Sequence, residues 1–251
     1  MSVAYERHIR LKGAFNVRDL GGYATAAGGM TRWRSFLRAD ALHQLSADDI
    51  DLLLQLGLRT VIDLRSDSEI TRDPSAFAGH EAVRYHHIPL FDGLAPVDAM
   101  MAEANAFDLS ARYLDAADRC RPAIARVATT IAGADEGIVL FNCTAGKDRT
   151  GIVAAMLLSL AGVDGDEIAA DYALTASIAG ALMEKLRTHA VARGLDETVS
   201  SRLLSSEPAS MLTFLRQMDE RYGGFAAYLA DGVAEADSIH LIRQRMVVGR
   251  Q

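Results

Sequence analysis

One nine-residue segment carries the residue types needed for phosphate chemistry: Cys143 to Gly151, CTAGKDRTG. It lies between an apolar run over 137–142, which predicts a buried strand, and an apolar run over 150–161, which predicts a buried helix. At such a junction successive backbone N–H groups can surround an anion, and the helix N-terminus adds its positive end. The segment therefore predicts an anion site with a cysteine at its base.

The chemistry of such a loop gives each side chain a role. Cations and helix N-termini lower a thiol pKa from about 8.5 to roughly 3.5–7.5, so Cys143 is expected to attack phosphorus as a thiolate. The planar fork of Arg149 can hold two phosphate oxygens, and the Thr150 hydroxyl can donate to the sulfur. Gly146 permits a backbone conformation closed to other residues, and Lys147 is expected at the rim, where it would suit a substrate with several phosphates. The predicted phosphate-binding residues are Thr144, Ala145, Gly146, Lys147, Asp148, Arg149 and Thr150.

Spacing alone is a weak signal, and the chain provides its own control. Cys120 and Arg126 have the same separation, but with no glycine between them and no strand before them, so Cys120 is expected to be a packing residue. A nucleotide-binding loop would need a glycine where Phe141 stands and Ser or Thr where Asp148 stands. The Cys143 segment therefore fits a cysteine-based phosphate loop and not a nucleotide loop.

Four separated segments carry recurrent motifs: AGKDRTG over 145–151, NVRDLGGY over 16–23, VIDLRS over 61–66 and, more weakly, DYALT over 171–175. Together they resemble the cysteine-dependent protein tyrosine phosphatases, in the bacterial form typified by mycobacterial protein tyrosine phosphatase B. The resemblance spans roughly residues 14 to 175. It implies a central, mostly parallel sheet flanked by helices.

The resemblance also carries residue-level implications. Asn16, Arg18 and Asp19 are polar residues of a turn-rich segment, expected to form a structural hydrogen-bond network, and the resemblance implies that this network lies near the loop. One position departs from the family, which has His before the nucleophile where this chain has Asn142. Asn can form hydrogen bonds but cannot be cationic, so the thiolate is expected to have less support.

The proton donor for the leaving group is open between two aspartates. General acid catalysis is typically worth about 10²–10⁴ in rate. Asp148 lies inside the loop beside Arg149, and Asp92 follows the expected strand end at 88–90, where related phosphatases place a mobile acid. The structural alternatives are an ion-paired loop carboxylate for Asp148 and a turn or cap residue for Asp92.

The elements that position the loop predict an α/β fold with a helical C-terminal half. Strands lie within the first 142 residues and the rest of the chain is helical, and no Pro/Ser-rich linker marks a domain boundary. The resemblance implies a single phosphatase domain over 1–251, with a lid insertion around 93–118 and a helical C-terminal extension. Strands are expected over 33–37, 59–64, 83–89 and 137–142. Helices are expected after Ser46, over 109–131 with a break near Pro122, and over 150–161, 165–181, 182–193, 208–222, 225–229 and 238–248.

Composition excludes several classes of protein. The net charge is −7 and no basic block is present, which argues against nucleic-acid binding. Two cysteines cannot form a disulfide framework, residues 1–10 do not read as a signal peptide, and the longest apolar stretch is too short to cross a bilayer. A cytoplasmic protein without a transmembrane segment is expected. The histidines show no ligand spacing, so no metal and no cofactor are expected, and the oligomeric state is open.

The leading hypothesis is a phosphomonoester hydrolase that forms a cysteinyl-phosphate on Cys143, with Arg149 and the loop amides holding the phosphoryl oxygens. The resemblance implies a phosphotyrosine protein substrate, and dual-specificity or phosphoinositide substrates stay open. A catalytically silent phosphate-binding pseudophosphatase is the main alternative, motivated by Asn142. A sulfur transferase is a third hypothesis, which the Arg149–Thr150 ending disfavours.

Overall fold

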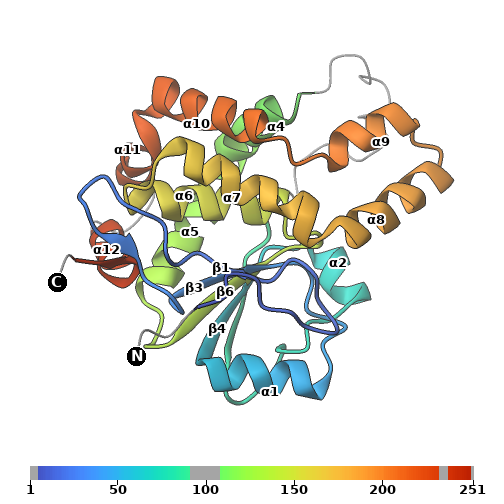
Figure 1. The fold of residues 1–251 in the computed structure, drawn as a ribbon, viewed down its shortest axis with the longest axis horizontal. Helices are drawn as coiled ribbons and strands as arrows, with labels where there is room; N and C mark the ends of the chain where they lie inside the picture. Colours follow the sequence, from blue (N-terminus) through green and yellow to red (C-terminus); the bar gives the residue numbers. More distant parts are fainter. Residues whose placement is uncertain (1–4, 91–107, 232–236, 250–251) are drawn as a thin grey trace.

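The computed structural model describes residues 5–90, 108–231 and 237–249, and its centre is a five-stranded sheet in the order β1-β3-β6-β4-β5 (Figure 1). The strands are β1 (Arg18–Asp19), β3 (Phe36–Ala39), β4 (Leu58–Asp63), β5 (Arg84–His87) and β6 (Ile138–Asn142). Only β1 runs antiparallel to its neighbour. A second sheet pairs β2 (Met30–Thr31) with β7 (Val247–Val248). The predicted mostly parallel central sheet flanked by helices is confirmed.

The central strand β6 is buried on both faces because its side chains alternate between two hydrophobic clusters. Val139 and Phe141 pack in the larger cluster with the helical C-terminal half, whereas Ile138 and Leu140 pack in the smaller cluster beside α1. Figure 1 shows α1 on one side of the sheet and α5, α6 and α7 on the other. Cys143, the residue after the strand, continues the alternation toward the larger cluster.

Helices account for most of the remaining chain. They are α1 (Ala47–Leu56), α2 (Asp67–Arg72), α4 (Leu109–Arg119), α5 (Arg121–Ala132), α6 (Asp148–Leu160), α7 (Gly165–Ile178), α8 (Gly180–Ala192), α9 (Glu197–Leu204), α10 (Pro208–Tyr222), α11 (Gly224–Ala230) and α12 (Ser238–Met246). The predicted break near Pro122 is confirmed, since this proline stands in the first turn of α5. Ser46 and Asp49 form a capping box at the start of α1, and Gly57 ends that helix with a φ of 103°.

The boundaries differ from the sequence predictions where long-range pairing decides them. The strand expected over 33–37 begins at Phe36, because Arg34 adopts a φ of 59° and its backbone N–H donates to Asp19. The helix expected over 238–248 ends at Met246, because the next two residues pair with β2. Of the lid insertion expected around 93–118, residues 93–107 lie outside the described residues and 109–118 belong to α4. No helix in the described ranges is long and apolar enough to cross a membrane.

Candidate active site

The cysteine loop lies at the carboxyl end of β6, between the parallel neighbours β3 and β4. Cys143 directly follows the strand and is 2% exposed, and α6 begins at Asp148 with Lys147 in the N-cap position. The four residues Thr144 to Lys147 therefore turn the chain from the strand into the helix. This is the strand–helix junction predicted from the sequence, with the orphan N–H groups of the helix start facing the loop.

Glycine is required at position 146 by two independent constraints. Gly146 has a φ of 65°, in the left-handed region that side chains disfavour. A Cβ atom there would lie 2.7 Å from the carbonyl group of Ala39 and from the backbone nitrogen of Asp40. The loop can therefore press against the end of β3 only with glycine at this position.

The carbonyl oxygens of the loop are tied to buried donors behind it. Asn16 Nδ2 donates to Ala145 O at 2.9 Å and to Gly146 O at 3.1 Å, and Arg38 Nη2 donates to Gly146 O at 2.9 Å. In a trans peptide the C=O and the following N–H point in opposite directions, so the N–H groups of Gly146 and Lys147 face away from these donors. None of the described residues accepts a hydrogen bond from either N–H group. These amides are available to an anion.

Arg149 is held at the edge of the loop by Glu69 of α2. Nη1 lies 2.6 Å from Oε2 and Nη2 lies 2.8 Å from Oε1, and Thr144 Oγ1 donates to the same carboxylate. Burial alone would lower the pKa of Arg149, but the hydrogen bonds to Glu69 and the charge of that carboxylate raise the pKa above its ordinary value. Burial would raise the pKa of Glu69, but Arg149 brings it well below the ordinary value. Both partners are therefore charged at neutral pH.

Sequence analysis missed Glu69, although a signal for it was present. Ser66 and Glu69 form a capping box at the start of α2, immediately after the VIDLRS motif. A Ser-x-x-Glu pattern marks a helix start, and a helix start at the carboxyl end of β4 lies beside the loop after β6. The pattern could have placed this carboxylate near Arg149.

Asp148 lies in the first turn of α6, and two polar groups hold its carboxylate. Oδ1 lies 2.8 Å from Lys147 Nζ and accepts a hydrogen bond from Tyr113 OH at 2.6 Å. Burial raises the pKa of Asp148, but the Lys147 charge and these hydrogen bonds outweigh burial and lower the pKa below its ordinary value. Asp148 is therefore a carboxylate at neutral pH, and its side chain stays 34% exposed.

The expectation that Lys147 lies at the rim is wrong. Its side chain is fully buried, and Nζ donates to Leu203 O and Ser205 O, both at 2.9 Å. The C-terminal end of α9 presents these two carbonyls, one from Leu203 in the last turn and one from the C-cap Ser205, and Asp148 supplies the counter-charge. The lysine therefore binds the helical half of the chain and does not face the mouth of the loop.

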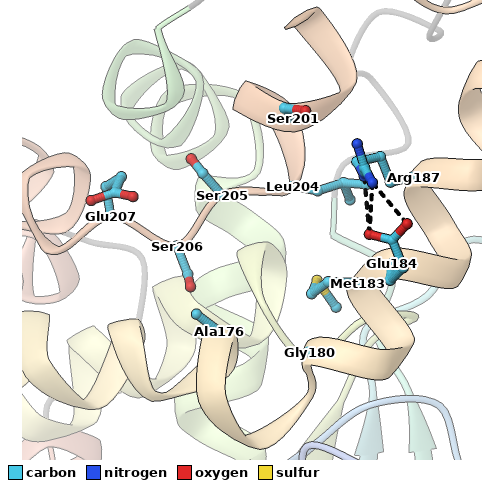
Figure 2. A pocket seen from close by; sticks show the side chains of 10 residues that line it. All are labelled: Ala176, Gly180, Met183, Glu184, Arg187, Ser201, Leu204, Ser205, Ser206 and Glu207. Carbon is cyan, nitrogen blue, oxygen red and sulfur yellow. Dashed lines mark hydrogen bonds and ion pairs between the residues drawn. The ribbon is translucent and has the colours of Figure 1, made fainter. Parts of the chain in front are cut away.

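A cavity of about 340 Å³ adjoins the segment that holds Lys147 (Figure 2). Met183 and the Glu184–Arg187 ion pair of α8 line one side, and Ser205 and Ser206 line the other. No residue of the cysteine loop lines it. The cavity is therefore separate from the anion site, although the carbonyl of Ser205 contacts Lys147.

Four further residues complete the comparison with the expected site. Thr150 Oγ1 and both side-chain polar atoms of Asn142 are buried without a hydrogen-bond partner in the described part of the chain, so the expected contact from Thr150 to the sulfur is not formed. Asp92 lies outside the described residues. Cys120 stands between α4 and α5, packed against the larger cluster. Within the described ranges no three His, Cys, Asp or Glu side chains gather to hold a metal ion.

Sequence comparisons with known proteins show one family. A family described as "Tyrosine phosphatase family" matches residues 9–248. A Cupriavidus necator protein that bears the name tyrosine-protein phosphatase is 32% identical over 228 residues, which cover 87% of this chain and 81% of that protein. Triple specificity protein phosphatase PtpB of Mycobacterium tuberculosis is 29% identical over 268 residues, covering 90% of this chain and 94% of PtpB. Among solved structures, P. aeruginosa TpbA is 20% identical with a TM-score of 0.34, over 72% of this chain and 96% of that chain.

Proposed function

The chain belongs to the tyrosine phosphatase family, and from that premise we propose that it removes phosphate from phosphotyrosine in proteins through a cysteinyl-phosphate on Cys143. The observation that carries the proposal is the loop itself. The N–H groups of Gly146 and Lys147 have no acceptor among the described residues, and they lie with Arg149 in the short stretch that follows the buried Cys143 at the end of β6. We therefore expect a single oxyanion to contact these groups and the sulfur.

The reaction follows from these positions. The Cys143 thiolate attacks phosphorus, a sulfur–phosphorus bond forms, and the bond from phosphorus to the leaving oxygen breaks. The loop amides and Arg149 stabilise the charge on the phosphoryl oxygens in the transition state. Water then attacks phosphorus, which releases inorganic phosphate and regenerates the thiolate. No group besides the chain and water is needed for the balance of atoms.

Asp148 is our choice for the proton donor among the described residues. Its carboxylate lies at the loop, partly exposed, and the resting charge of Lys147 keeps it ionised. A phosphate dianion in the loop would offset the effect of the Lys147 charge and raise the pKa of Asp148. Asp148 would therefore take up its proton when the substrate binds. Asp92 stays the alternative donor.

The position of Lys147 favours substrates with one phosphate. A second phosphate of a phosphoinositide would need a cation at the rim, and the buried Lys147 does not provide it. PtpB bears the name triple specificity phosphatase, and activity of this chain beyond phosphotyrosine remains part of the proposal.

A single phosphatase domain is supported by the family match over 9–248, and a cytoplasmic location is supported by two cysteines that form no disulfide.

Turnover of p-nitrophenyl phosphate by the wild type and by Cys143→Ser tests the proposal. We expect the wild type to turn over and to accumulate a phosphoryl adduct on Cys143 after acid quench, detectable by peptide mass, and the variant to do neither. Cys120→Ser is the matched control, because its sulfur lies outside the loop, and it should behave as the wild type. Equal slow turnover by wild type and Cys143→Ser would favour the silent phosphate-binding alternative that the unpartnered Asn142 amide motivates.

A further inference from the structure

A buried charge cluster lies behind the cysteine loop, built from residues far apart in the sequence. Asp171 of α7 accepts from Arg38 Nη1 at 2.5 Å and from Arg18 Nε at 3.2 Å. All three side chains are at most 1% exposed. Tyr23 OH adds a hydrogen bond at 3.0 Å to the same carboxylate. Burial raises the pKa of Asp171, but the two arginines bring it down to about 2, so the cluster is ionised.

Two arms lead from Asp171 to the loop and meet at one atom. Arg38 reaches the loop directly, through Nη2 to Gly146 O at 2.9 Å and to Lys147 O at 3.4 Å. Arg18 reaches it through Asn16, whose Oδ1 accepts from Arg18 and whose Nδ2 donates to Ala145 O and Gly146 O. Gly146 O therefore accepts from both arms. Three consecutive loop carbonyls are fixed by one carboxylate on α7.

The carbonyls fixed in this way decide where the loop amides point. Each carbonyl is rigidly linked to the next residue's N–H, so fixing Ala145 O, Gly146 O and Lys147 O orients the N–H groups of Gly146, Lys147 and Asp148. A guanidinium suits this task, because its planar fork can bind a carboxylate and a carbonyl at the same time, whereas an ammonium is a point charge. Such orientation matters because preorganised donors stabilise a transition state without reorganising during the reaction.

We propose that Arg38, anchored by Asp171, is a positioning residue that aims the loop amides at the phosphoryl group, with Asn16 as its partner on Gly146 O. The inference rests on the proposed function only in taking the loop as the phosphate site. It gives this buried arginine of β3 a role in oxyanion binding, beyond the effect on stability that any buried ion pair has. Arg38 itself does not touch the substrate.

The chain offers a matched control in Arg245. This arginine also donates to backbone carbonyls, Ala134 O at 2.9 Å and Gly137 O at 2.7 Å, and its Nε, like that of Arg38, is buried without a partner in the described residues. Those carbonyls precede β6, at the opposite end of the strand from Cys143. Replacing Arg245 removes the same kind of contact without reaching the loop.

The experiment measures binding of inorganic phosphate by calorimetry, in the Cys143→Ser background, for Arg38→Met, Arg38→Lys and Arg245→Met. We expect at least a tenfold loss of affinity for Arg38→Met, a smaller loss for Arg38→Lys, and no change for Arg245→Met. In proteins with Cys143 intact, alkylation of that cysteine is followed by peptide mass with iodoacetate and with iodoacetamide. The rate with iodoacetate divided by the rate with iodoacetamide should fall in Arg38→Met. Only iodoacetate is a carboxylate that uses the anion site, whereas both reagents need the same thiolate.

Circular dichroism and thermal unfolding establish that each variant is folded. If Arg38→Met does not fold, Asn16→Ala takes its place, since it removes the other donor to Gly146 O and keeps the ion pair. Phosphate affinity and alkylation ratio within twofold of wild type in a folded Arg38→Met, or in Asn16→Ala where that variant stands in, would overturn the proposal. Because neither readout needs turnover, failure of the phosphatase reaction itself would leave these results interpretable.

Discussion

Arg149 and Glu69 form a two-point ion pair at the rim of the cysteine loop, with Nη1–Oε2 at 2.6 Å and Nη2–Oε1 at 2.8 Å. The carboxylate accepts from one backbone N–H, that of Ser66, and from no amide of the cysteine loop within the described residues. Glu69 therefore lies on the outer edge of the guanidinium and not in the anion site. The Nε edge of Arg149 has no partner among the described residues and is left for phosphate.

Replacing Glu69 with Gln should lower kcat/KM for p-nitrophenyl phosphate by about tenfold. The neutral amide of Gln has one acceptor oxygen, whereas the carboxylate of Glu69 has two and a negative charge. Gln therefore cannot accept from both Nη atoms, and Arg149 loses its fixed orientation. Steady-state kinetics and thermal unfolding separate this loss from instability. Asp67→Asn is the control, because Asp67 is also in the first turn of α2 but does not contact Arg149. A rise in phosphate affinity in Glu69→Gln would contradict the account, since it would make Glu69 a competitor for the anion site.

Replacing Asp148 with Asn should reduce kcat on phenyl phosphate by about 10² and on p-nitrophenyl phosphate by much less. The p-nitrophenolate leaves without a proton, whereas phenolate needs one, so the loss of a general acid depends on the leaving group. Rates over a series of aryl phosphates measure this dependence. Asp166→Asn, in the first turn of α7, is the control. Equal losses on both substrates would remove Asp148 as the acid and return the role to Asp92.

Replacing Lys147 with Met should destabilise the protein by about 3 kcal/mol, because Asp148 loses its counter-charge and two partly buried carbonyls lose their donor. Urea unfolding measures the loss, with exposed Lys12→Met as the control. At a temperature where the variant is folded, kcat/KM for p-nitrophenyl phosphate and for a soluble phosphoinositide should change by the same factor. A selective loss on the phosphoinositide would show that Lys147 reaches the rim during the reaction.

Asp40 should make stability depend on pH in a particular direction. Burial raises the pKa of Asp40 to about 6, although the backbone N–H groups of Asn16 and Phe15 oppose the rise. In the unfolded chain an aspartate titrates near about 3.9. Between these values the folded protein holds a proton that the unfolded chain has released, so the unfolding free energy falls as pH rises from about 4 to 6.

Unfolding by urea at several pH values checks this direction in the wild type and in Asp40→Asn, which cannot titrate. The unfolding free energy of the wild type, relative to the variant, should fall by on the order of 2 kcal/mol from pH 4 to pH 7. Asp51→Asn on α1 is the control and should keep the wild-type pH dependence. A difference between wild type and Asp40→Asn that is constant with pH would contradict the assignment.

Local patterns were enough to predict the part of the site that is continuous in sequence. The apolar run of β6, the glycine of the loop and the apolar helix α6 lie next to one another, so the junction follows from periodicity and turn chemistry. The same holds for α1, whose cap and terminal glycine are both visible in the sequence. The short elements α2 and α9 were missed, because a helix of one or two turns has little periodicity to detect.

The residues that support the loop could not be found in the same way. Arg38 and Asp171 are far apart in the sequence, and only the packing of α7 against the loop brings them together. The direction of Lys147 depends on two carbonyls at the C-terminal end of α9, which no motif encodes. The charge of a lysine in a phosphate loop predicts a position at the rim, but the two carbonyl partners determine that Lys147 is buried.

A crystal structure of the protein with vanadate or phosphate tests the central claim most directly. We expect the oxyanion directly above the Cys143 sulfur, with hydrogen bonds from the N–H groups of Gly146 and Lys147 and from Arg149 Nε, and with Glu69 still on the outer edge of the guanidinium. An anion bound elsewhere at saturating concentration, or a loop whose amides point away from the sulfur, would contradict it.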